Sequence, residues 1–205
     1  MKIVFSPSAG VPARSAESIF VIKMCEALAA AGHQVTLLNP RTPDRTADVP
    51  DTYGHYGVKR NFSIVDIPFP TMPVKRGYSS LRAVLRARRL GTDVVYTRAL
   101  YTAVIAARFG FPTVFEMHGP VGDEGSLDDR LLRRLLRSRR LLRIVVITHA
   151  LKRYLQEQYG VPAVRITVAP DAADVPAESE QIADLDSSRL HVGYVGHLYP
   201  GRGIE

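Results

Sequence analysis

The amino-acid sequence predicts a doubly wound α/β fold, in which a parallel β-sheet has helices on both faces. Short β-rich segments alternate with segments of helical periodicity along most of the chain, an order that is typical of parallel sheets. Several β-rich segments, including residues 2–5 and 144–147, are almost continuously apolar, as strands buried on both faces should be. The chain has 205 residues, of which 46% are hydrophobic and 23% charged, so it can bury a sizeable core.

Seven strands are expected from this alternation. They are residues 2–6, 35–38, 63–67, 93–97, 113–117, 144–147 and 164–169. The first helix is the clearest, because Ser15 is placed to cap it, Glu17 lies in its first turn and Gly32 follows its last apolar residue. The polar stretch 39–61 is predicted to be a long, weakly ordered surface loop.

Composition and charge change after residue 169. Residues 1–169 hold 25 Lys and Arg against 13 Asp and Glu, whereas residues 170–205 hold 2 against 7. We therefore predict a basic domain at residues 1–169, an acidic interdomain linker at 170–187, and the first strand and loop of a second domain at 188–205. The net charge of +7 indicates an anionic binding partner. Phospholipid, a phosphate-bearing substrate and nucleic acid each fit this description.

The single cysteine, Cys25, lies among apolar residues at helical spacing, and we expect it in the core. One cysteine excludes an internal disulfide framework and fits a reducing compartment. The N-terminus reaches Pro7 too soon for the apolar core of a secretory signal, and no apolar stretch approaches the roughly 20 residues of a spanning helix. We therefore expect a cytoplasmic protein.

Ligands bind parallel sheets beyond the carboxyl ends of the strands, so the residues that follow each strand are the candidates for a site. Gly10 precedes the first helix, where the chain and its free amides could approach a phosphate or a sugar closely. Arg98 ends the segment Tyr-Thr-Arg, and Glu116, His118 and Gly119 end the next strand. Histidine can orient or deprotonate a hydroxyl near neutral pH; ordinary turn and loop roles for Gly10 and His118 remain open alternatives.

A glycine-rich segment follows the strand predicted after the acidic linker. Backbone amides of Gly196 and Gly201, with His197 and Arg202, are placed to hold a diphosphate. The segment is close to a P-loop, but it lacks the hydroxyl that would bind magnesium. A nucleoside triphosphatase is therefore disfavoured.

Residues 127–143 alternate leucine and arginine in a pattern that predicts one amphipathic helix. Five arginines fall in one sector of this helix: Arg130, Arg133, Arg134, Arg137 and Arg140. The helix is either an ordinary surface helix or a docking face for anionic lipid headgroups. A second basic group would widen this face if it lies nearby: Lys75, Arg76, Arg82, Arg86, Arg88 and Arg89.

Taken in order, these motifs resemble those of the retaining, GT-B-type glycosyltransferases of the large family that assembles lipids and polysaccharides. The matching segments are Gly-His-Gln-Val at 32–35, Tyr-Thr-Arg at 96–98, Glu-x-His-Gly at 116–119, Val-Ile-Thr at 146–148, Pro-Asp at 170–171 and the glycine-rich loop at 193–203. The resemblance implies a Rossmann-like, acceptor-side domain followed by the beginning of a donor domain. It also implies a nucleotide-sugar donor and a glycan or lipid-linked acceptor.

The resemblance further implies roles for the candidate residues. Gly10 would border the cleft, His118 would lie beside the reacting groups, and Arg98, Glu116 and Gly119 would contact substrate or support those that do. Arg202 would help to hold the donor diphosphate without a metal, since such enzymes stabilise the leaving group with cations and helix amides. The chain departs from the family at Val11, where a second glycine is common, at His197, where arginine is common, and at Arg202, which replaces lysine.

Two other classes of protein remain open at this stage. One is a basic module that binds nucleic acid or phospholipid; the lack of tryptophan and of aromatic residues interleaved with a compact basic face disfavours nucleic acid as a partner. The other is an epimerase that acts on nucleotide sugars and has the same two-domain shape. Residues 188–205 contain too little of a donor domain for catalysis, so we expect the 205 residues to be inactive by themselves.

Overall fold

The computed structural model describes residues 1–13, 15–42, 49–70, 75–173, 186 and 188–193. The chain divides into two units, Met1–Asp171 and Ala172–Glu205. All helices and strands within the described residues belong to the first unit.

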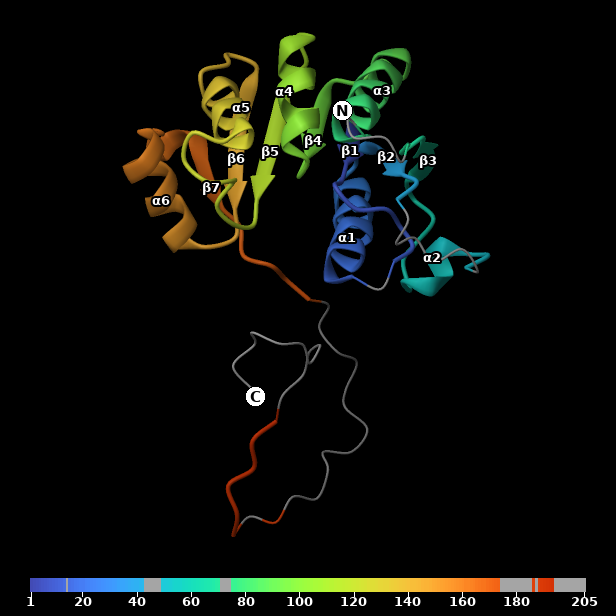
Figure 1. The fold of residues 1–205 in the computed structure, drawn as a ribbon. Coiled ribbons are helices and arrows are strands. Elements are labelled where there is room, and N and C mark those ends of the chain that lie inside the picture. The colour runs from blue at the N-terminus through green and yellow to red at the C-terminus, as the bar shows by residue number, and fades with distance from the viewer. Residues whose placement is uncertain (14, 43–48, 71–74, 174–185, 187, 194–205) are drawn as a thin grey trace. The chain divides into compact units, whose positions relative to one another are not determined.

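The first unit is built on one seven-stranded sheet in the order β3-β2-β1-β4-β5-β6-β7 (Figure 1). Every neighbouring pair of strands is parallel. The strands are β1 (Lys2–Ser6), β2 (Gln34–Pro40), β3 (Ser63–Ile67), β4 (Val94–Thr97), β5 (Thr113–Met117), β6 (Leu141–Val146) and β7 (Ile166–Val168). The predicted doubly wound parallel sheet is confirmed.

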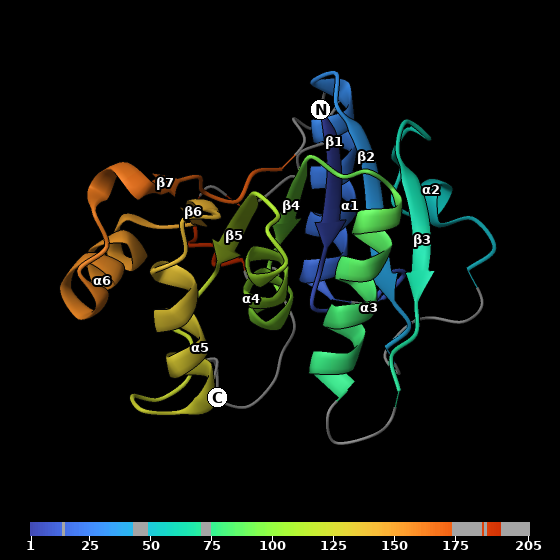
Figure 2. The ribbon, with the colours of Figure 1, turned by 90° about the horizontal axis from the view of Figure 1, so that it is seen from above.

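Helices connect successive strands and cover the sheet. They are α1 (Ala16–Ala30), α2 (Thr52–His55), α3 (Lys75–Arg89), α4 (Leu100–Arg108), α5 (Leu127–Leu136), α6 (His149–Tyr159) and the short 3-10 helix η1 (Ala163–Arg165). Figures 1 and 2 show α3, α4 and α5 in a row along the sheet. This arrangement follows from the strand order. The connections from β1 to β2 and from β3 onwards cross the sheet in opposite directions. Right-handed crossovers therefore place α1 on one face and α3, α4 and α5 on the other.

Alternate residues of the strands enter different cores. On β1, Ile3 and Phe5 pack with α1, whereas Val4 packs with α3 and α4. A third cluster joins β5 and β6 to α4, α5 and α6. Cys25 is fully buried in the α1 core, where desolvation raises the pKa of its thiol, so the prediction of a core cysteine is confirmed.

The first helix has the expected ends. The Ser15 side chain accepts a hydrogen bond from the backbone N–H of Ser18, and Gly32 follows the helix with a φ of +85°. A side chain at Gly32 would be strained in this left-handed conformation, so glycine is the natural stop signal here.

The prediction of a weakly ordered loop at residues 39–61 is wrong for the described part of that segment. β2 continues to Pro40, α2 follows Asp51, and Val58 joins the core under α1 together with Phe62. Residues 43–48 lie outside the described residues. The prediction followed the turn-forming residues that dominate the composition of this stretch. It overlooked the few apolar side chains that pack the stretch against the domain.

The prediction of one helix over residues 127–143 is also wrong. α5 ends at Leu136, and Leu141 begins β6, where it pairs with Thr113 of β5. Arg137 and Arg140 therefore lie outside the helix. Short apolar runs fit helix and strand alike, and pairing in the sheet decided the outcome at Leu141.

The described residues of the second unit do not form the predicted first strand of a donor domain. Leu190 and Val192 are exposed, and residues 190–193 form no strand. A single strand needs neighbours to pair with before it is stable. Most of the predicted linker and the whole of segment 194–205 lie outside the described residues.

The loop after β1 is attached to the end of β2 by Asn39. This fully buried amide accepts a hydrogen bond from the backbone N–H of Val11 at 2.8 Å and donates to the Val11 carbonyl at 2.8 Å. It also donates to Asp66 at the end of β3, at 2.8 Å. One side chain thus joins the ends of three neighbouring strands.

We predict that Asn39→Ala destabilises the domain by about 1–3 kcal/mol, because it leaves buried polar groups of Val11 without partners. Asn61→Ala is the matched control, since Asn61 makes an exposed hydrogen bond to Glu26, and it should cost less than about 0.5 kcal/mol. Urea unfolding measures both. Equal losses would contradict the role assigned to Asn39.

Candidate functional site

Glu116 and His118 form a pair at the carboxyl end of β5. The Glu116 side chain is almost completely buried, and its Oε1 contacts Nε2 of His118. Its other oxygen, Oε2, accepts a hydrogen bond from the Tyr96 hydroxyl at 2.5 Å. A carboxylate only accepts hydrogen bonds, so His118 donates through Nε2 and keeps Nδ1 for another partner.

The register of the sheet brings Tyr96 to Glu116. Tyr96 pairs with Val114 across β4 and β5, and Glu116 lies two residues further along, on the same face. Tyr96 also stacks on Phe5 of β1, with ring centroids 5.0 Å apart. Burial, followed by the negative charge of Glu116, raises the pKa of Tyr96. The phenol therefore stays protonated and remains a donor to the carboxylate.

Phe20 of α1 lies between His118 and Arg98. Its ring meets the His118 ring edge-on at 5.3 Å, and the Arg98 guanidinium carbon lies 4.9 Å from its centroid. The Nη1 atom of Arg98 is buried and has no hydrogen-bond partner among the described residues. The sequence indicated Arg98 and His118, whereas Phe20 was missed because its position on the first helix gave no sign of a site.

Gly10 has a structural role of its own. Its N–H donates to the Thr42 hydroxyl at 2.9 Å. A side-chain carbon at this position would lie 2.5 Å from the Pro40 carbonyl oxygen and 2.5 Å from the Thr42 hydroxyl oxygen. Glycine is therefore required by the close approach of two loops, whatever else borders it.

The remaining candidates are placed differently. Apart from its two chain neighbours, no described residue has an atom within 4 Å of where a side chain of Gly119 would begin. The four residues predicted to hold a diphosphate lie outside the described residues; they are Gly196, His197, Gly201 and Arg202.

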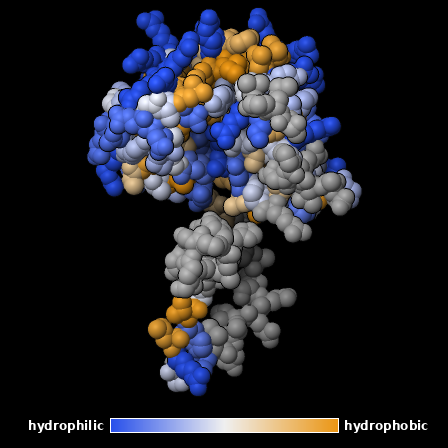
Figure 3. Space-filling view, in the orientation of Figure 1, coloured by the Kyte–Doolittle hydropathy of each residue, from blue (hydrophilic) through white to orange (hydrophobic). Residues whose placement is uncertain are grey.

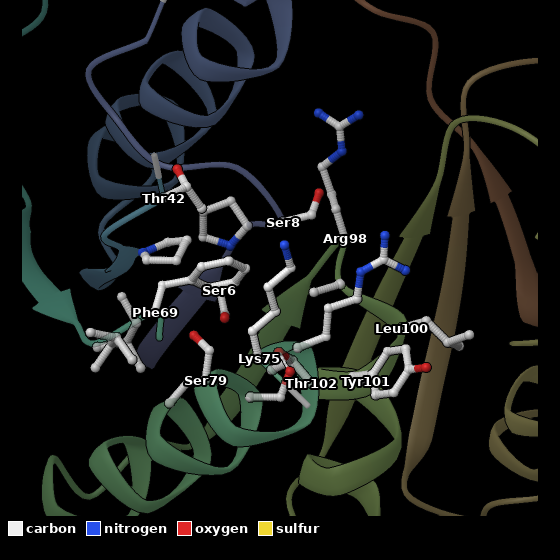
Figure 4. Close-up of a pocket in the computed structure, with 18 of the residues that line it drawn as sticks. Ser6, Ser8, Thr42, Phe69, Lys75, Ser79, Arg98, Leu100, Tyr101 and Thr102 are labelled. Atoms are coloured by element: carbon white, nitrogen blue, oxygen red, sulfur yellow. Dashed lines mark hydrogen bonds between the residues drawn. The ribbon is translucent and has the colours of Figure 1, made fainter. Parts of the chain in front are cut away.

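A cavity of about 470 Å³ lies at the same edge of the sheet, against α3 and α4 (Figure 4). It is lined by Ser6 at the end of β1, Ser8 just after β1, Arg98 after β4, and Lys75 and Arg76 at the start of α3. The sequence suggested Lys75 and Arg76 only as part of a basic surface. Their position after β3, at the edge where parallel sheets bind ligands, was the signal that could have identified them.

The arginines of α5 have unequal environments. Arg133 donates to the buried Asp129 carboxylate at 3.0 Å and lies over the Tyr159 ring. Tyr159 also donates to Asp129, at 2.9 Å. By contrast, Arg130 and Arg134 are exposed, so these two are the arginines of α5 that face solvent.

Neither a metal-binding cluster nor a membrane-spanning helix is present in the described part of the chain. No three His, Cys, Asp or Glu side chains are grouped closely enough there to hold a metal ion. None of the helices there is both long and apolar enough to cross a membrane.

The model of the family described as Glycosyltransferase Family 4 matches residues 18–175 of the chain. No curated protein sequence matches the chain significantly. Similarity to known proteins is therefore carried by the family pattern and by the fold.

Solved structures share the fold at low sequence identity. HepE from Anabaena in complex with UDP is 16% identical with a TM-score of 0.56, and the match covers 85% of this chain and 45% of HepE. Sucrose-phosphate synthase from Thermosynechococcus elongatus is 15% identical with a TM-score of 0.61, over 85% of this chain and 49% of the synthase. UDP-GlcNAc 2-epimerase from Methanocaldococcus jannaschii is 14% identical with a TM-score of 0.59, over 82% and 45%. The chain thus spans about half the length of these structures.

We predict that Tyr96→Phe destabilises the domain by about 1–3 kcal/mol, because the buried Glu116 carboxylate loses a donor. Tyr78→Phe is the matched control, since Tyr78 is exposed on α3. In a double-mutant cycle with Glu116→Gln, measured by urea unfolding, Tyr96→Phe should couple by at least about 1 kcal/mol. Additive effects would contradict the hydrogen bond between the two side chains.

Proposed function

Because the chain belongs to Glycosyltransferase Family 4, we propose that it forms the acceptor-binding portion of an enzyme that moves a sugar from a nucleotide-sugar donor to a glycan or lipid-linked acceptor. The observation that carries this proposal is the position of His118. Glu116 holds one nitrogen of its ring at the carboxyl edge of a parallel sheet, which is where such sheets bind ligands.

His118 is the residue to which we assign contact with the reacting groups. With Nε2 directed to Glu116, Nδ1 can orient a substrate hydroxyl or exchange a proton with it. Arg98, on the other side of Phe20, adds a cation to the same edge. Glu116 acts through His118, and its burial keeps the pair in one arrangement.

The donor side of the reaction rests on the family resemblance. We propose that Gly196, His197, Gly201 and Arg202 hold the diphosphate and that cations and amides stabilise it as it leaves, with no metal and with retention of configuration. The 205 residues should be inactive alone, because residues 188–205 would supply only the first strand and loop of the donor domain.

We expect a polypeptide that joins these residues to a complete donor domain to transfer sugar from a UDP-, GDP- or ADP-sugar in the presence of EDTA. His118→Ala should lower the rate at least about a hundredfold. His33→Ala is the matched control, because His33 precedes β2 at the opposite edge of the sheet, and it should leave the rate unchanged. NMR of the anomeric proton in the product reports retention.

Two outcomes would contradict the proposal. A folded joined polypeptide that neither binds nor consumes any nucleotide sugar would remove the enzyme assignment and favour a basic binding module. Release of an epimerised sugar without any acceptor would indicate an epimerase.

We also propose that the face formed by α3, α4 and α5 lies against an anionic membrane surface. α3 has six basic residues and no acidic one, and Tyr78, Leu81 and Leu85 are exposed along it. Figure 3 shows an apolar band on this side of the molecule with hydrophilic residues around it. Exposed apolar side chains flanked by cations are the pattern of a surface that binds lipid headgroups.

We predict that the protein sediments with vesicles that contain phosphatidylglycerol at low salt. Arg130→Gln with Arg134→Gln should weaken this binding about thirtyfold, since each basic residue near the surface contributes about 1 kcal/mol. Lys23→Gln with Lys59→Gln removes the same charge on the α1 side of the sheet and should have less than about a threefold effect. Equal effects of the two pairs would overturn the assignment of this face.

A further inference from the structure

The cavity against α3 and α4 contains an excess of positive charge. Lys75, Arg76 and Arg98 line it, and of the described residues that line it only Asp128 has a carboxylate. Lys75 lies 5.9 Å from the centre of the Phe69 ring. In the described part of the chain none of the three cations forms an ion pair. Cations gathered in a concave site without carboxylate partners are matched to an anionic ligand.

Arg98 supplies a more specific observation. Its Nη1 atom is buried and lacks a partner among the described residues, and a buried donor without an acceptor is unfavourable. Figure 4 shows Arg98 entering from the end of β4 and Lys75 extending from the start of α3 towards the loop that carries Ser8. Both side chains line the cavity, and their N–H groups are donors of the kind that a phosphate accepts.

The start of α4 adds backbone donors. Ala99 precedes this helix and gives no side-chain cap, unlike Ser15, Ser126 and Thr148 at the starts of α1, α5 and α6. The first turn of α4, including Tyr101 and Thr102, lines the cavity. Free amides and the helix dipole favour an anion at this position, in the cavity that the three cations also line.

The other walls suit a small hydroxylated molecule. The hydroxyls of Ser6 and Ser79 and the rings of Phe69 and Tyr101 border a space of about 470 Å³. This volume is within the range of small-molecule sites. Arg98 joins this cavity to His118, because it lines the cavity and also lies over the Phe20 ring that contacts His118.

We propose that this cavity binds a phosphate group on the acceptor, so that the acceptor is a phosphorylated sugar or polyol, either free in solution or as the headgroup of a lipid. The assignment of this ligand as the acceptor rests on the proposed function. Lys75, Arg76 and Arg98 hold the phosphate, and the hydroxylated part of the molecule extends towards His118, where one hydroxyl receives the sugar.

The test is calorimetric titration of the 205-residue chain with defined probes. Glucose 6-phosphate represents the free ligand and dihexanoylphosphatidate, a soluble short-chain lipid, represents the headgroup. At least one should bind about tenfold more tightly than its unphosphorylated counterpart, glucose or dihexanoylglycerol, as charge-assisted hydrogen bonds to a phosphate imply. The tighter of the two probes identifies the source of the phosphate.

Two double variants on the same helix separate the cavity from general charge. Lys75→Gln with Arg76→Gln should weaken binding of the phosphorylated probe at least about tenfold. Arg88→Gln with Arg89→Gln removes the same charge at the other end of α3, outside the cavity, and should change affinity less than about twofold.

The proposal is overturned if phosphate has no effect on affinity, if both double variants lose affinity equally, or if UDP alone binds and Lys75→Gln with Arg76→Gln abolishes that binding. This titration needs no donor domain. If the joined polypeptide transfers sugar but phosphate-dependent binding is not found, the cavity proposal is rejected and the proposed function is kept. If phosphate-dependent binding is found but no sugar is transferred, the cavity binds phosphate and the proposed function is rejected.

Discussion

The buried carboxylate of Glu116 is the interaction on which the arrangement of this site depends. An ionised group away from water is very unfavourable unless it is fully hydrogen-bonded, and here Tyr96 and His118 supply the donors. Tyr96 is itself held by stacking on Phe5 in the centre of the sheet. The orientation of the His118 ring is therefore determined by contacts that reach back to β1, and any substrate meets a histidine whose direction is already set.

The parallel direction of all strands explains why two separate groups of side chains meet at one edge. Tyr96 and Glu116 lie on the α1 side of the sheet, whereas the cavity lies on the α3 side. Both groups reach the carboxyl edge because every strand ends there. Arg98, which follows β4, contributes to both, because it lines the cavity and lies over the Phe20 ring that contacts His118.

The sequence predicted what depends on local pattern and missed what depends on packing between distant segments. The strands, the Ser15 cap, the Gly32 stop and the buried Cys25 follow from periodicity and turn chemistry. The hydrogen bond from Tyr96 to Glu116 depends on the register of β4 against β5, which no local pattern specifies. In the same way, the burial of Val58 under α1 became visible only in the fold.

The basic residues of the chain have several different environments, and only the structure distinguishes them. Arg133 donates to Asp129 and lies over the Tyr159 ring, so it joins the first turn of α5 to the last residue of α6. Arg130 and Arg134 of α5 are exposed to solvent, where they can be attracted to a charged surface. Lys75, Arg76 and Arg98 surround a cavity and have no ion-pair partners among the described residues. A count of basic residues treats these groups as equivalent. Their surroundings show that Arg133 supports the fold. They favour a surface role for Arg130 and Arg134, and ligand binding for the cations that line the cavity.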